Sequence, residues 1–91
     1  MEVPRDQVCV LIPTLNEEPT IGPLIDRFHA LGYSDILVVD GNSIDRTREI
    51  ALKSGAKVIV QKGKGKGAAF IQAIKQISKP YILLIDGDNT Y

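Results

Sequence analysis

Two aspartates separated by one glycine, Asp86 and Asp88, are the residues of this sequence best suited to bind a metal ion. Side chains two residues apart in an extended segment point the same way, so both carboxylates can converge on one cation. Mg²⁺ and Mn²⁺ prefer oxygen ligands and commonly keep substrate phosphates in their shell. A cation held there would neutralise a diphosphate and stabilise its departure. The alternative is a polar turn, because Asp-Gly is a common turn pair.

Acidic residues also follow two other apolar segments. Asp40 could accept hydrogen bonds from a nucleobase or a ribose, or it could serve only the turn that Gly41-Asn42-Ser43 indicates. Asn16 is expected to cap the start of the first helix, and Asp45 is expected to cap the start of the second. Glu17 stands at the start of that earlier helix, where the helix dipole favours negative charge.

Lysine and glycine alternate over residues 62–67. Glycines allow backbone N–H groups to approach an anion, and the N-terminus of a following helix attracts one. The P-loop pattern is not present. Gly63, Gly65 and Ala68 match G-x-G-x-x-A, which gives a rival hypothesis of dinucleotide binding, but this hypothesis leaves the acidic segments unexplained. A solvated loop is the structural alternative.

The elements that must position these residues alternate between strands and helices. Four short segments are apolar on both faces, as in parallel sheets covered by helices on both sides: Val8–Ile12, Ile36–Val39, Val58–Val60 and Tyr81–Ile85. Three helical patterns lie between them: one from Ile21 to Leu31 with Gly32 as its stop, one from Asp45 to Ser54 with Gly55 after it, and one through Phe70 and Ile77 that Pro80 closes.

This alternation predicts the α/β class, with a three-layer doubly wound parallel sheet of strand order 3-2-1-4. The chain reverses direction between the first and fourth strands. Ligands of open α/β sheets bind at such a point, outside the carboxyl ends of the strands. The acidic segments and the lysine loop all follow strands, so we expect them at this one edge.

The composition limits the remaining possibilities. The 91 residues form one domain at most, residues 1–91, and the formal net charge of zero argues against nucleic acid as a partner. The single cysteine, Cys9, lies in an apolar run and is expected to be buried. No signal peptide or membrane span is predicted, which fits a cytoplasmic location. His29 has no second histidine with which to form a metal or catalytic site.

Four motifs of the sequence are LIPTLNEE (11–18), VVDGNSIDRT (38–47), KGKGAA (64–69) and LIDGD (84–88). In register, they resemble a known family, the inverting GT-A glycosyltransferases of the family-two type. Among these, the chain is most similar to dolichyl-phosphate mannose synthases and related polyprenyl-phosphate glucosyltransferases. The resemblance covers nearly the whole chain, in the right order.

The resemblance implies a role for each matching residue. Pro13, Leu15 and Glu17 would line the nucleoside pocket, and Val38 and Asp40 would contact the base. The lysine loop, with Lys66, would lie beside the nucleotide. Asp86, Gly87 and Asp88 would contact ribose and diphosphate, with Asp86 and Asp88 as the catalytic aspartates. Asp88, together with Thr90, would hold Mg²⁺ or Mn²⁺.

Three departures from the family pattern bear on this assignment. Leu15 replaces a residue that is often aromatic, Gly41 replaces a frequent second Asp, and the family's acceptor half would lie beyond Tyr91. We therefore read the chain as an apparently truncated N-terminal half.

The resemblance implies transfer of a hexose, from GDP-mannose or UDP-glucose, to a polyprenyl (dolichyl) phosphate or similar acceptor at the cytoplasmic face of a membrane, with inversion. A nucleotide- or metal-binding module without turnover is the main alternative, and a dinucleotide-binding fragment of an oxidoreductase is the weaker one. The open edge of the fourth strand predicts a homo-oligomer.

Overall fold

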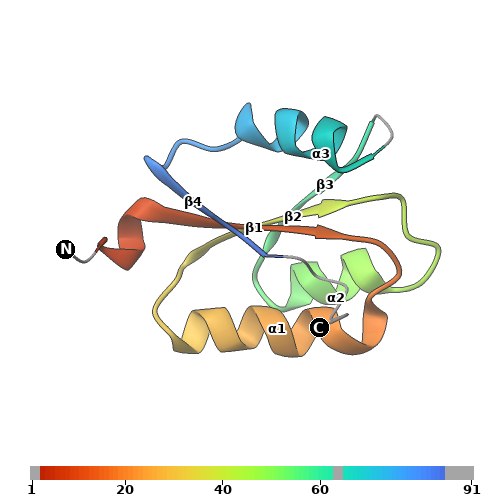
Figure 1. The fold of residues 1–91 in the computed structure, drawn as a ribbon. Coiled ribbons are helices and arrows are strands. Elements are labelled where there is room, and N and C mark those ends of the chain that lie inside the picture. Colours follow the sequence, from red (N-terminus) through yellow and green to blue (C-terminus); the bar gives the residue numbers. More distant parts are fainter. Residues whose placement is uncertain (1–2, 63–64, 86–91) are drawn as a thin grey trace.

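The chain folds into one parallel sheet with helices on both faces (Figure 1). A computed structural model describes residues 3–62 and 65–85; the side chains of residues 65, 66 and 69 are also outside the described part. The order of elements is η1 (Arg5–Gln7), β1 (Val8–Thr14), α1 (Glu18–Ala30), β2 (Asp35–Asp40), α2 (Thr47–Lys53), β3 (Lys57–Val60), α3 (Gly65–Ile74) and β4 (Tyr81–Leu84).

The strand order is β3-β2-β1-β4, as the sequence predicts, and all three pairings are parallel. β1 pairs with β2 from Cys9↔Asp35 to Thr14↔Asp40. It pairs with β4 over Val8–Leu11. The chain therefore reverses direction between β1 and β4, which is where the predicted ligand edge lies.

Side chains of the two inner strands are buried on both faces, which explains their uninterrupted apolar sequence. Along β1, Val10 and Ile12 pack under α1 and α2, whereas Cys9 and Leu11 face α3. Figure 1 shows α1 and α2 below the sheet and α3 above it. The core on the α3 side is the smaller one, because a single helix covers it.

Two predicted boundaries differ from the structure. β1 does not stop at Pro13 but continues to Thr14, paired with β2. The carbonyl of Leu11 accepts a hydrogen bond from the N–H of Ile85 at 2.9 Å, so the backbone groups of Leu11 face β4. Pro13 is two residues further along the strand and faces the same side, beyond the residues that pair with β4. Its missing N–H therefore costs no hydrogen bond of the ladder. α3 ends at Ile74, well before Pro80, in a turn where Gln76 N–H bonds to Ala73.

Glycine ends two helices as predicted. Gly32 and Gly55, which follow α1 and α2, have φ values of +99° and +95°, the left-handed conformation that glycine adopts without steric cost. Within the described residues, no helix is long and apolar enough to cross a membrane.

Cys9 is buried, as predicted, and should be unreactive in the folded protein. Its side chain is 1% exposed, and burial, together with the negative charge of Asp35, raises the pKa of the thiol to about 11. Only the thiolate is nucleophilic, so at pH 8 the native thiol has little reactive form. We expect labelling by a disulfide reagent to be slow in the native state and fast in denaturant. Equal rates in both conditions would contradict the buried position.

Candidate functional site

The carboxyl ends of β1 and β2 lie side by side at one edge of the sheet. Thr14 and Asp40, the last residues of the two strands, are paired in the ladder, and Gly41 N–H bonds to the Thr14 carbonyl at 2.8 Å. The segments 15–17 and 41–46 therefore leave the sheet from one place. This is the edge at which the sequence predicts a ligand.

The two segments are joined by reciprocal hydrogen bonds. The N–H of Asn16 donates to Ser43 Oγ at 2.8 Å, and the N–H of Ile44 donates to Asn16 Oδ1 at 2.9 Å. Asn16 has a φ of +53°, a conformation that asparagine tolerates better than most residues. The prediction that Asn16 caps α1 is wrong, because Glu17 occupies the cap position and the Asn16 side chain holds the neighbouring segment.

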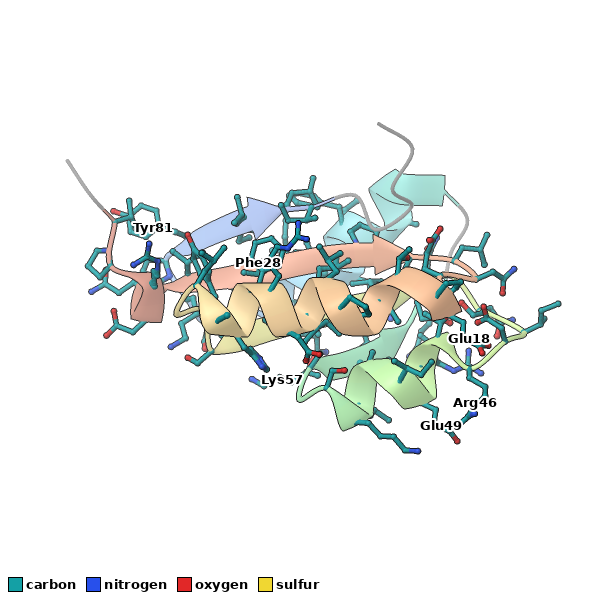
Figure 2. All side chains as sticks on the ribbon, turned by 90° about the horizontal axis from the view of Figure 1, so that it is seen from below. Glu18, Phe28, Arg46, Glu49, Lys57 and Tyr81 are labelled. Carbon is teal, nitrogen blue, oxygen red and sulfur yellow. The ribbon has the colours of Figure 1, made fainter. Side chains whose placement is uncertain are left out.

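A second set of bonds joins the starts of α1 and α2. Glu17 N–H donates to Thr47 Oγ1 at 2.8 Å, and Glu18 N–H donates to Asp45 Oδ2 at 3.3 Å. Arg46 N–H donates in return to Glu18 Oε1 at 3.0 Å. The free N–H groups at the start of each helix thus find acceptors on the other helix or its leading segment. Figure 2 shows Glu18 and Arg46 at this end of the molecule, beside Glu49.

The prediction that Asp45 caps α2 is wrong, because the helix begins at Thr47 and Arg46 occupies the cap position. Its carboxylate still accepts hydrogen bonds from the Thr47 N–H, at 3.0 Å, and from the Thr47 hydroxyl. The hydroxyl bond is the main reason that the pKa of Asp45 lies below its ordinary value. Asp45 therefore bridges α1 and α2 rather than capping one of them.

Among the described residues of this edge, Asp40 has a fully buried carboxylate with no exposed surface. It accepts hydrogen bonds from the Ser43 N–H at 2.7 Å, from the Ser43 hydroxyl, and from Arg48 Nη1 at 2.9 Å. Arg48, on α2, is 38% exposed, so the pair joins a buried anion to a cation at the surface. The sequence leaves two roles open for Asp40, contact with a nucleobase or ribose and support of the turn that follows it. These bonds match the second role, and contact with a base stays a prediction.

The other residues predicted to line the nucleoside pocket differ in exposure. Leu15 is 55% exposed, while Pro13 and Glu17 are half-buried. The Glu17 carboxylate accepts a hydrogen bond from Thr20 Oγ1 at 3.0 Å. Val38 is fully buried in the core under α1 and α2, so its side chain presents no surface to a ligand in this structure.

Gly41 shapes the space beside Leu15. A Cβ atom at position 41 would lie 3.4 Å from the Thr14 carbonyl oxygen and within 3.7 Å of the Leu15 side chain. The glycine that departs from the family pattern therefore leaves room next to the exposed leucine.

The remaining predicted site residues fall outside what the structure describes. Lys66 belongs to α3, but its side chain is not described. Asp86, Gly87, Asp88 and Thr90 follow the last described residue, Ile85, so their roles stay predictions. Between residues 3 and 85, in the described parts, no group of three or more metal-binding side chains comes together.

Sequence reasoning did not find Ser43, Thr47 or Arg48 as parts of this edge. The fully buried hydroxyl of Thr47 bonds both Glu17 and Asp45. Ser43 lies in the loop after β2, and Thr47 and Arg48 lie in the first turn of α2, so the only available signal was their polar character. Their partners, about thirty residues away for Ser43 and Thr47, follow only from strand register.

The valine variant of Thr47 should lose stability, because it leaves the Glu17 N–H without its acceptor. We expect Thr47→Val to lower the free energy of unfolding by about 1–3 kcal/mol, the usual cost of an unpaired buried group. The half-buried Thr20 provides the matched control, and Thr20→Val should cost clearly less. Urea unfolding of both variants measures the difference.

The effect of Thr47→Val should also depend on pH. The Thr47 hydroxyl lowers the pKa of Asp45 below its ordinary 3.8. That stabilisation is therefore present above pH 3.8 and is lost as the pH falls through the lowered value. The difference between wild type and Thr47→Val should narrow in acid. An equal cost at all pH values would show that Asp45 contributes nothing to it.

An open parallel sheet that reverses between β1 and β4, with polar segments at its carboxyl edge, defines a doubly wound α/β protein. Proteins of this class commonly bind their ligands at such an edge. The sequence model of glycosyl transferase family 2 matches residues 9–91. The chain belongs to this family.

Similar proteins from archaea give the same result. The chain is 48% identical over 87 residues to glycosyltransferase AglJ of Haloferax volcanii, covering 94% of this chain and 29% of that protein. It is 40% identical over 89 residues to a dolichyl-phosphate hexose transferase of the same organism, covering 94% of this chain and 38% of that one. The chain thus spans only about a third of the length of these relatives.

Solved structures confirm the GT-A fold. Mannosyl-3-phosphoglycerate synthase from Rubrobacter xylanophilus superposes with a TM-score of 0.85 at 33% identity, over 89% of this chain and 30% of that one. Glucosyl-3-phosphoglycerate synthase from Mycobacterium tuberculosis, solved with Mn²⁺, UDP-glucose and phosphoglyceric acid, gives 0.81 at 32% identity, over 89% and 33%. Family membership also disfavours the oxidoreductase hypothesis.

Proposed function

We propose that this chain is the donor-binding part of an inverting, metal-dependent glycosyltransferase that transfers a hexose from a nucleoside-diphosphate sugar. The observation that carries the proposal is the joined carboxyl edge of β1 and β2, in a chain whose family match extends through Asp86 and Asp88. A neighbour solved with Mn²⁺ and UDP-glucose supports this class of donor.

The proposed metal ligands offer the oxygen donors that a hard divalent cation prefers. Asp88 and Thr90 would hold Mg²⁺ or Mn²⁺, and all of their side-chain donors are oxygens. Bound there, the cation would neutralise the diphosphate leaving group. Asp86 and Asp88 are the proposed catalytic residues.

The chain's own contribution is to hold and orient the donor. Pro13, Leu15 and Glu17 would line the nucleoside pocket, and the hydrogen bonds between the two segments would hold these residues in place before the ligand arrives. Preformed geometry of this kind lowers the cost of ordering a bound donor. Asp40 would act by supporting the 41–46 segment, or by direct contact with the base after a rearrangement that exposes it.

The proposed acceptor is a polyprenyl phosphate at the cytoplasmic face of a membrane. A relative named as a dolichyl-phosphate hexose transferase supports this class of acceptor. A phosphate acceptor is already an anion and needs no general base, so attack on the opposite face of the anomeric carbon would depend on positioning and on the leaving group. GDP-mannose and UDP-glucose are the two proposed donors.

Calorimetric titration with GDP and with UDP, each with and without Mn²⁺, tests the donor site. We expect one nucleotide to bind only with the metal, and Asp88→Ala to weaken that binding by at least about a hundredfold. Asp26→Ala, which removes an exposed carboxylate from α1, is the control and should bind normally. Equal binding by Asp88→Ala and wild type would reject Asp88 as a ligand.

The alternative of a binding module without turnover needs a second measurement. The release of free nucleotide from the nucleotide-sugar that binds is measured, because both hydrolysis and transfer of the sugar produce it. This release distinguishes a transferase from a binding module. Metal-dependent binding without any release, in the presence of polyprenyl phosphate, would favour the binding module.

A further inference from the structure

β3 ends at the same edge of the sheet as β1 and β2. Val60, its last residue, pairs with Asp40, which pairs in turn with Thr14. The N–H of Gln61 donates to the Asp40 carbonyl at 2.7 Å, so the ladder continues one residue past the end of β3. Lys62 is the next residue, and it therefore lies at the carboxyl edge, one strand further from β1 than Asp40 does.

The side-chain amide of Gln72, on α3, holds the backbone at Lys62. Its Oε1 accepts the N–H of Lys62 at 2.8 Å, and its Nε2 donates to the carbonyl of Val60 at 2.8 Å. The N–H of Gln61 faces β2, so the backbone groups of its two neighbours face the opposite side, where Gln72 takes the place of a further strand. The backbone of Lys62 is therefore fixed against α3 without a ligand.

Lys62 differs from the arginines of this edge in the state of its charge. Arg48 Nη1 lies 2.9 Å from the Asp40 carboxylate, and Arg46 Nη2 lies 2.6 Å from the carboxylate of Glu49. The side chain of Lys62 is exposed, and its ammonium forms no ion pair with any residue that the structure describes. An ammonium donates up to three hydrogen bonds and accepts none. Lys62 thus offers a free cation on a fixed backbone, which suits recognition of an acceptor atom.

The order of the strands indicates which part of a donor this ammonium would meet. In the proposed function, the diphosphate and its cation lie after β4, and the nucleoside lies beside β1 and β2. β3 is three strand spacings from β4, roughly 14 Å, which is further than a lysine side chain reaches. Lys62 is therefore at the nucleobase end of the row and away from the diphosphate.

We propose that Lys62, held in place by Gln72, recognises a carbonyl oxygen on the nucleobase of the donor. This inference rests on the proposed function and names what selects the base. Uracil carries a carbonyl oxygen where cytosine carries an amino group, and guanine carries one where adenine carries an amino group. An ammonium donates to the carbonyl oxygen, but it meets a second donor in the amino base, and both groups then lack a partner. Lys62 selects the carbonyl base, and Gln72 is its positioning residue.

Calorimetric titration in the presence of Mn²⁺ tests this selection with two pairs of nucleotides, UDP against CDP and GDP against ADP. In the pair that contains the bound nucleotide, wild type is expected to prefer the carbonyl base by at least about tenfold. Lys62→Met should lose that preference. Lys53→Met, which removes an exposed lysine at the other end of α2, is the matched control and should keep it.

Gln72 is tested by the same ratio of affinities. Gln72→Leu removes both bonds to the end of β3 and should lower the preference for the carbonyl base, whereas Gln76→Leu, at an exposed glutamine, should not. Gln72→Glu retains an acceptor for the Lys62 N–H and should lower it less, which gives a second variant if Gln72→Leu does not fold. A purely structural role would weaken both nucleotides of a pair equally and leave the ratio unchanged.

Each other outcome overturns the inference. Equal binding of both nucleotides of a pair by wild type, or preference for the amino base, would show that no carbonyl oxygen is recognised. An unchanged preference in Lys62→Met would assign the recognition to another residue, and an unchanged preference in both Gln72 variants would reject Gln72 as the positioning residue. A wild type that binds none of the four nucleotides would overturn the proposed function as well, so the two failures are distinguishable.

Discussion

The alanine variant of Asp40 is expected to unfold with a free energy lower by about 3 kcal/mol. The carboxylate has no exposed surface and accepts three hydrogen bonds, two from Ser43 and one from Arg48. Its removal leaves the buried Ser43 N–H without a partner. Part of the cost of a broken ion pair is avoided, because Arg48 is 38% exposed and can be hydrated.

A double-mutant cycle with Arg48→Met separates the two contributions. Arg48→Met alone should cost less than Asp40→Ala, because the Ser43 bonds to the carboxylate remain. The double variant should lose less free energy of unfolding than the sum of the two single variants. This difference measures the coupling between Asp40 and Arg48, and it should be smaller than the cost of leaving the Ser43 N–H without its acceptor. Denaturant unfolding without nucleotide measures all four proteins. A loss below about 1 kcal/mol for Asp40→Ala would show that the buried carboxylate is not a structural support.

The alanine variant of Ile12 should lose about 2–5 kcal/mol of its free energy of unfolding, as expected for a large side chain removed from a core. Ile12 is fully buried on β1, an inner strand, and packs with residues of the sheet, α1 and α2. Deletion of its buried methyl groups removes apolar contacts and leaves a cavity that an inner strand cannot easily close. Domains of this kind are stable by only about 5–15 kcal/mol, so a substantial fraction of the variant should unfold at modest denaturant concentrations.

Two controls make the core prediction specific. Ile12→Val removes one methyl group and should cost only about 0.5–1.5 kcal/mol. Ile44→Ala changes a side chain that is 94% exposed and should be nearly neutral. Similar losses for Ile12→Ala and Ile44→Ala would contradict the assignment of Ile12 to the core.

The sequence alone predicted the class of fold and the strand order. The reason is that the strands apolar on both faces, Val8–Ile12 and Ile36–Val39, can be buried only in a parallel sheet covered by helices, and right-handed crossovers then leave few topologies. Local chemistry also predicted the helix stops at Gly32 and Gly55, because a left-handed residue ends a helix at little cost only where no Cβ is present. The family prediction came from the resemblance of the four motifs to known family members, not from fold geometry.

Only the tertiary structure decided how the carboxyl edge is held together. Asn16, Ser43 and Thr47 are ordinary loop and helix residues in the sequence, and their partners became known only when the register set Thr14 beside Asp40. Side chains about thirty residues apart then meet, so the predicted caps Asn16 and Asp45 bridge two segments instead. Burial likewise depends on all layers at once: the sheet and its helices enclose the Asp40 carboxylate and leave Ile82 and Leu84 uncovered.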